Sequence, residues 1–100
     1  MVPTARPALR LLVVRSGGFA GTPREWRVET DDVAPWDRLL EACPWGSAAT
    51  DHGSRDRFVW RIEATRGRRR RSASVPEAGL TGPWQTLVAG VRSWAEASRG

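Results

Sequence analysis

The chain contains no lysine, tyrosine or asparagine, and it has one cysteine and one histidine. Without lysine it cannot form a Schiff base or the phosphate-binding lysine contact of a Walker-type loop. A single Cys43 and a single His52 cannot build a zinc cage of cysteine and histidine ligands. One cysteine also cannot close an internal disulfide. No nucleophile stands beside a base, so we expect no catalytic residue, no metal and no cofactor.

Long hydrophobic runs are also absent. The longest one near the N-terminus covers residues 11–14 and is flanked by Arg10 and Arg15. A signal-peptide core needs about 7–15 apolar residues and a membrane-spanning helix about 20. The sequence therefore predicts neither, and we expect a cytoplasmic protein that has no membrane partner and is monomeric when free.

The composition is typical of one globular domain: 100 residues, 40% hydrophobic and 27% charged. Residues 1–8 contain two prolines and no periodicity, so we expect a tail there and a single domain over 9–98. All 16 positive side chains are arginine, and the net charge is +5. Lysine, asparagine and tyrosine share AT-rich codons. Their absence indicates a GC-rich bacterial genome, so the arginine surplus by itself is weak evidence of function.

The first half of the chain predicts a hairpin and a helix. Residues 9–14 are apolar on both faces, which is typical of a central strand, and residues 24–30 alternate with Trp26 and Val28 inward. The glycine-rich residues 15–23 separate these strands. Asp31 and Asp32 are expected to supply helix N-terminal chemistry, and Pro35 suits the first turn. The helix stripe comprises Trp36, Leu39, Leu40 and a buried Cys43, and Pro44 ends it.

The second half repeats the pattern after a polar loop over 45–56, in which Trp45 is expected to be partly exposed. Residues 58–64 alternate as a strand, 66–67 suggest a turn, and 69–75 form a weaker edge strand that Pro76 ends. A last helix begins at Pro83, capped by Thr81 or Gly82. Its expected buried stripe comprises Trp84, Leu87, Val88, Val91, Trp94 and Ala95. The order β-β-α-β-β-α predicts a two-layer α+β sandwich, a four-stranded antiparallel sheet with two helices on one face.

The arginine run over 66–71 allows two interpretations. Clustered arginines neutralise phosphates, so the run could belong to a small basic nucleic-acid-binding module. The run contains no aromatic residue on which bases could stack. The alternative is a charged hairpin tip that protects a sheet edge, and we favour it.

The loop over 15–21 is the unusual feature of the sequence. It reads Arg15, Ser16, Gly17, Gly18, Phe19, Ala20 and Gly21. A phosphate-binding glycine loop needs a helix after it, and a strand follows here. Phe19 either folds back over the sheet or points outward as the contact residue of a binding loop.

This loop resembles the signature opening of emfourin-like proteins, small bacterial inhibitors of thermolysin-type zinc metalloproteases such as protealysin. The later segments 57–62 and 80–91 resemble the family's strand and final helix. The resemblance implies that residues 15–21 bind a thermolysin-like metalloprotease, with Phe19 as an apolar plug in its cleft. Such proteases favour a bulky apolar residue after the scissile bond, and any zinc would belong to the target.

Overall fold

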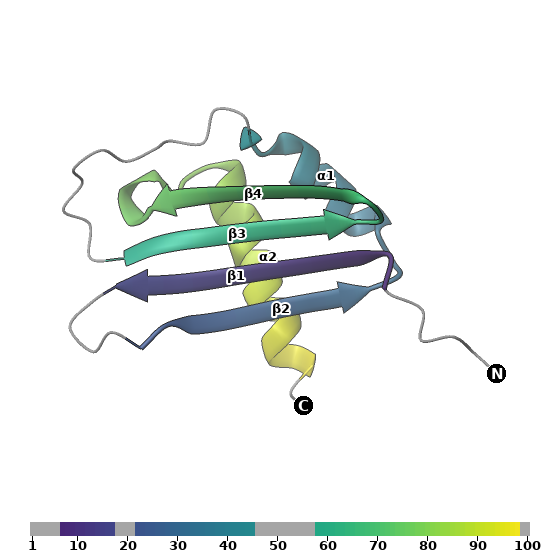
Figure 1. The fold of residues 1–100 in the computed structure, drawn as a ribbon, viewed down its shortest axis with the longest axis horizontal. Coiled ribbons are helices and arrows are strands. Elements are labelled where there is room, and N and C mark those ends of the chain that lie inside the picture. The colour runs from purple at the N-terminus through teal and green to yellow at the C-terminus, as the bar shows by residue number, and fades with distance from the viewer. Residues whose placement is uncertain (1–6, 18–21, 46–57, 99–100) are drawn as a thin grey trace.

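The computed structural model describes residues 7–17, 22–45 and 58–98. Its elements are β1 (Leu9–Gly17), β2 (Arg24–Thr30), α1 (Ala34–Ala42), β3 (Phe58–Arg66), β4 (Arg69–Pro76), the short 3-10 helix η2 (Glu77–Gly79) and α2 (Pro83–Ser98). The strands form one four-stranded antiparallel sheet in the order β2-β1-β3-β4. Both helices lie behind the same face of this sheet (Figure 1). The predicted two-layer α+β sandwich is confirmed.

The apolar character of both faces of β1 is explained by its central place between β2 and β3. Leu9, Leu11 and Val13 point toward the helices and are fully buried. Leu12 and Val14 point to the other face, here called the open face, and are half-buried. The predicted coverage of this second apolar pair is therefore confirmed, and β4 lies at the edge as expected.

The core lies between the sheet and the two helices. Two of its four buried tryptophans, Trp26 and Trp60, stack with ring centroids 5.8 Å apart. From the helices, the buried side chains are Trp36, Leu40, Trp84, Leu87, Val88 and Val91. Most residues expected to face inward thus meet in one buried cluster, while Leu39, Trp94 and Ala95 of the helical stripes pack against it partly buried. At roughly 25 cal/mol per Å² of buried apolar surface, this cluster dominates the stability of the fold.

The C-terminal end of α1 is joined to the start of α2 through Trp45. Its indole Nε1 donates a hydrogen bond to the Leu40 carbonyl oxygen at 2.8 Å. Its ring meets that of Trp84 edge-on, with centroids 4.9 Å apart. Trp45 is half-buried, which confirms the expected partial exposure.

The start of α1 corrects one expectation. Asp31 and Asp32 do not cap the helix: the N-cap residue is Val33, and no side chain bonds the free amides there. The Asp31 carboxylate instead accepts a hydrogen bond from the backbone amide of Ala8 at 2.9 Å. The reason is geometric, because Asp31 directly follows β2 and stands beside the start of β1. Pro35 does lie in the first turn of the helix, as predicted.

Trp94 corrects a second expectation. It is partly buried rather than fully buried, although it continues the stripe of α2. The C-terminal end of α2 reaches beyond the edge strand β2 (Figure 1). Trp94 borders an open groove between α1 and α2 that Trp36 and Leu39 also line.

We expect Trp94→Ala to lower the free energy of unfolding by about 2 kcal/mol. Complete burial of a tryptophan would predict about 3–5 kcal/mol for the same change, and Trp94 keeps part of its surface in water. Urea denaturation of both proteins measures the difference. A loss above about 4 kcal/mol would show that Trp94 is a core residue in solution.

A stabilising substitution is available at Gly90, inside α2. A methyl group there would lie 3.5 Å from Cζ3 of Trp36 and 3.6 Å from Cδ1 of Leu39, which are ordinary van der Waals distances. Glycine inside a helix is less favourable than alanine by about 0.5–1 kcal/mol. We therefore expect Gly90→Ala to raise the melting temperature by several degrees, at roughly 4–8 °C per kcal/mol for a domain of this size.

Gly82 provides the matched control for this prediction. It also has room for a methyl group, with no atom within 4 Å, but its φ of +57° is unfavourable for alanine. Gly82→Ala should lower the melting temperature. A decrease for Gly90→Ala as well would contradict the packing described for the interface of α1 and α2.

Candidate functional site: the connection between β1 and β2

The base of the predicted binding loop belongs to the sheet. Arg15, Ser16 and Gly17 form the last part of β1, so the prediction that the loop begins at Arg15 is wrong. The reason is strand pairing: Arg15 is paired with both β2 and β3, and β3 alone continues the pairing through Ser16 and Gly17. The partners of the three residues on β3 are Trp60, Val59 and Phe58 respectively. The remaining predicted site residues, Gly18, Phe19, Ala20 and Gly21, lie outside the described residues.

Gly17 marks the point at which the chain leaves the sheet. Its φ of +108° lies in a region that other residues rarely adopt. Its strand partner β3 holds it in register opposite Phe58. The glycine at this position therefore has a defined role, which is to let the backbone turn out of the strand directly before Gly18.

Arg15 is held at the base of the loop by aromatic rings. Its Cζ lies 4.6 Å from the ring centre of Phe58, 5.7 Å from that of Trp60 and 6.0 Å from that of Trp26. The side chain is half-buried on the helix side of the sheet, while Ser16 and Gly17 are exposed. A guanidinium is attracted to the face of an aromatic ring, and several rings hold it better than one. The start of the loop is thus fixed both by backbone pairing and by a side-chain contact.

Two further arginines near the loop were not identified as candidate site residues from the sequence. Arg24 stands directly opposite Arg15 on β2, and Arg92 of α2 lies over the same Trp26 ring. Strand parity could have indicated Arg24, because it is two residues before the inward-facing Trp26. Helical spacing could have indicated Arg92, because it is four residues after the buried Val88.

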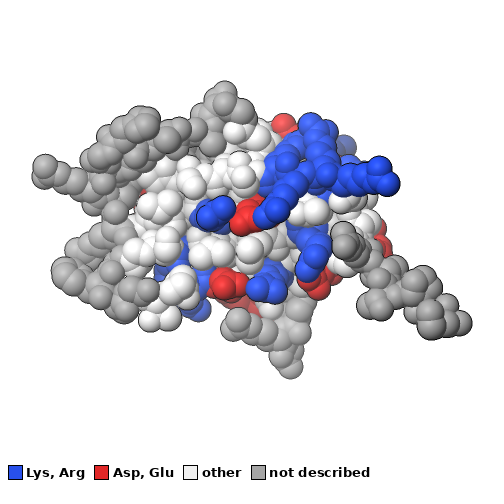
Figure 2. All heavy atoms as spheres, viewed as in Figure 1, with Lys and Arg blue, Asp and Glu red and all other residues white. Residues whose placement is uncertain are grey.

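The open face of the sheet divides into a charged end and a largely uncharged end. Figure 2 shows the positive charge gathered over the end that carries the β3–β4 turn, far from the connection between β1 and β2. Near that connection the open face presents Val14, Ser16 and Val59. Val59 is the one large hydrophobic side chain among the described residues that is classed as exposed, at 40%. These uncharged side chains lie beside the predicted binding loop.

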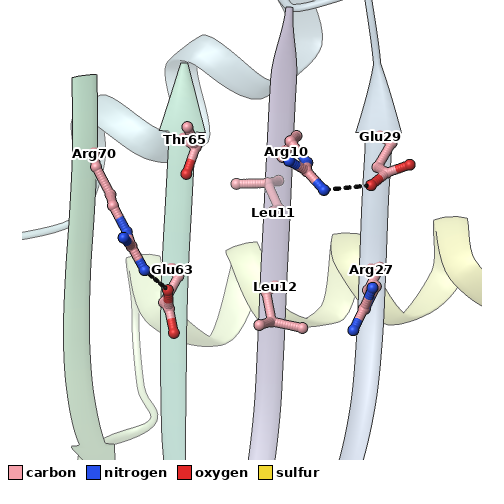
Figure 3. Close-up of a pocket in the computed structure, with 8 residues that line it drawn as sticks. All are labelled: Arg10, Leu11, Leu12, Arg27, Glu29, Glu63, Thr65 and Arg70. Carbon is pink, nitrogen blue, oxygen red and sulfur yellow. Dashed lines mark hydrogen bonds and ion pairs between the residues drawn. The ribbon is translucent and has the colours of Figure 1, made fainter. Parts of the chain in front are cut away.

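A hollow of about 400 Å³ lies at the charged end of the open face. Four of its charged groups pair with one another (Figure 3): Arg10 with Glu29 at 3.3 Å and Arg70 with Glu63 at 2.8 Å. The fifth, Arg27, meets Glu25 outside the hollow at 3.2 Å. Glu63 also meets Arg61 at 3.4 Å. Mutual pairing leaves little unbalanced charge for a ligand, and such exposed pairs each contribute at most about 1 kcal/mol to stability. The hollow is therefore a solvated charged surface rather than a ligand site.

The arginine run 66–71 forms the β3–β4 hairpin tip, with its turn at Gly67 and Arg68. Several of its members pair with carboxylates of this same chain. Arg66 meets Asp37 at 2.6 Å, and Arg71 meets Glu41 at 3.2 Å, both on α1. Arg70 is paired with Glu63. Of the arginines in the run, Arg68 and Arg69 have no ion pair in the described structure. This arrangement favours the charged hairpin tip over the nucleic-acid module.

Other classes of site find no support in the described residues. Within residues 7–17, 22–45 and 58–98, no group of three or more His, Cys, Asp or Glu side chains is placed to hold a metal. No helix of that part of the chain is long and apolar enough to cross a membrane. Cys43 is buried, and its Sγ donates to the Leu39 carbonyl oxygen at 3.2 Å. Burial raises the pKa of the Cys43 thiol to about 11, so it is not a nucleophile at neutral pH.

The fold and its loop define a small α+β domain that presents a glycine-rich connection from the end of a central strand. The family model for Emfourin matches residues 13–92, and the chain belongs to the Emfourin family. Membership implies the role of a metalloprotease inhibitor, with a protease as the partner. Comparisons with curated proteins and with solved structures found no match.

Proposed function

We propose that this protein inhibits thermolysin-like zinc metalloproteases by inserting the connection between β1 and β2 into the active-site cleft. Phe19 fills the apolar pocket that accepts the residue after the scissile bond. The observation that carries the proposal is the family match, which spans the whole connection. Glycine amides and carbonyls around Phe19 pair with an extended strand of the protease cleft, in the manner of β-augmentation.

The way the ends of the connection are held supports this proposal. β1 is paired through Gly17 and β2 begins at Arg24, so a segment of six residues joins two fixed points. Fixed ends lower the entropy lost when the segment is ordered in a cleft. The loop residues gain affinity from this support even though glycine is the most conformationally free residue.

A competition experiment tests the proposed mode of binding. Initial rates of a thermolysin-like protease are measured over a range of substrate and inhibitor concentrations. Occupation of the cleft predicts competitive inhibition: the apparent inhibition constant rises linearly with substrate concentration, and kcat is unchanged. Inhibition that lowers kcat at saturating substrate would show that the protein binds outside the cleft.

A further inference from the structure

Three arginines surround one buried ring at the base of the predicted binding loop. The Cζ atoms of Arg15, Arg24 and Arg92 lie 6.0, 5.3 and 5.0 Å from the ring centre of Trp26. They come from β1, β2 and α2, three separate elements of the fold. We call this group the Trp26 arginine cluster. Trp26 itself is 3% exposed and stacks on Trp60, so the cluster stands on a rigid part of the core.

The positive charge of the cluster is not neutralised within the described structure. Ion pairs there involve other arginines, namely Arg10, Arg27, Arg61, Arg66, Arg70 and Arg71. Arg15 and Arg24 are moreover direct cross-strand neighbours, a position in which like charges destabilise a sheet. The Trp26 ring offsets part of this repulsion by attracting each guanidinium, but it supplies no negative charge.

We propose that the Trp26 arginine cluster binds carboxylate groups of the target protease at the rim of its cleft. This inference rests on the proposed function, because it places the cluster beside the inserted loop. Arg15 precedes Gly17 by two residues, and Arg24 follows Gly21 by three. When the loop enters a cleft, these side chains therefore lie at its edge. The partner of the cluster is therefore a protein surface that carries Asp and Glu carboxylates at the rim of the protease cleft.

Guanidinium groups held over aromatic rings are well prepared for carboxylates. Contact with a ring engages no N–H donor in an ion pair, so the donors of the guanidinium fork stay available for a bidentate contact. The contacts with Trp26, Trp60 and Phe58 already order Arg15 before the protease arrives. Less side-chain entropy is then lost on binding. Unpaired positive charge at the rim also accelerates association with an acidic surface.

The test compares two double variants with equal loss of charge. Arg24→Gln with Arg92→Gln removes two charges from the cluster. Arg68→Gln with Arg69→Gln removes two charges from the far end of the sheet, where no ion pair is broken in the described structure. The inhibition constant toward thermolysin and the association rate constant are measured at about 0.05 M and about 0.5 M salt. The low concentration screens the attraction between the two proteins weakly, and the high concentration screens it strongly. Thermal melts establish that each variant is folded.

The cluster variant should raise the inhibition constant about ten-fold at low salt, mainly through slower association, and the difference should shrink at high salt. The control variant should change it less than about two-fold. The inhibition constant of the double variant Arg24→Lys with Arg92→Lys should lie between those of the unmodified protein and the glutamine variant. Lysine keeps the positive charge but lacks the planar donor fork of arginine. If the glutamine double variant fails to fold, Arg24→Gln alone serves, since Arg24 is exposed.

Equal effects of the two glutamine pairs would overturn the inference, because net charge alone would then explain them. An unchanged inhibition constant for the cluster variant, together with weaker inhibition by Phe19→Ala, would also overturn it while the proposed function stands. Absence of inhibition by the unmodified protein would overturn the proposed function and this inference together.

Discussion

Phe19→Ala should weaken inhibition of a thermolysin-like protease about thirty-fold and leave the fold unchanged. The side chain is proposed to lose its water when it enters an apolar pocket of the protease, a transfer worth roughly 2 kcal/mol. That free energy corresponds to about a thirty-fold rise in the inhibition constant. Alanine at this position fits the same backbone, so the rest of the loop can still bind. The measurements are an inhibition curve and a thermal melt for each protein.

The thermal melt distinguishes the binding role of Phe19 from a structural role. A phenylalanine that folds back over the sheet would stabilise this domain, and its removal would lower the melting temperature. Arg68→Gln with Arg69→Gln provides a comparison in which the loop is untouched. A lower melting temperature for Phe19→Ala with unchanged inhibition would contradict the proposed contact. Loss of affinity for DNA by the arginine variant, with a weaker salt dependence, would favour the nucleic-acid interpretation instead.

The second large effect concerns stability at alkaline pH. Burial raises the pKa of the Cys43 thiol to about 11, from the ordinary value of 9.0. Between these values the unfolded chain has lost the thiol proton while the folded protein still holds it. The contribution of the protonated thiol to the free energy of unfolding is therefore complete below pH 9. It falls as the pH rises and is lost once the pH has passed 11. A difference of two pKa units corresponds to about 3 kcal/mol of unfolding free energy.

The composition makes this effect unusually easy to assign. The chain has no lysine and no tyrosine, and arginine stays charged up to about pH 12. Cys43 is therefore the one side chain expected to titrate between about pH 8.5 and 12. Urea denaturation of the unmodified protein and of Cys43→Ala across this range measures the slope. Cys43→Ala should be less stable at pH 8 but nearly independent of pH above it. Parallel pH profiles for the two proteins would contradict the assignment.

Much of the fold could be predicted because the strongest sequence patterns are local. Residues 24–30 and 58–64 alternate cleanly, and their inward side chains, such as Trp26 and Ile62, are the buried ones in the structure. Glycine and proline mark the connections, and Pro83 begins α2 as expected. These signals depend on neighbours along the chain, so a single sequence reveals them.

The features that could not be predicted depend on residues far apart in the sequence. β1 continues through Gly17 because β3 pairs with it, and no local pattern reports that pairing. Asp31 bonds the amide of Ala8, which the hairpin brings beside it. The stripe of α2 gave no sign of where the helix passes the edge of the sheet, so Trp94 looked like a core residue.

The candidate site shows the same division between local motif and distant contact. The glycine-rich string around Phe19 indicated the loop by its composition alone. The Trp26 arginine cluster could not be found in this way, because Arg15, Arg24 and Arg92 meet only after two strands and a helix have packed. Arginine is also common throughout this chain, so three separate arginines do not stand out in its sequence.

The most direct test of the central claim is inhibition by the unmodified protein itself. Its inhibition constant is measured against a panel of thermolysin-like metalloproteases, with a serine protease as the control. We predict competitive inhibition of at least one metalloprotease of the panel and no effect on the serine protease. Failure to inhibit any of the metalloproteases, by a protein shown to be folded, would contradict the proposed function.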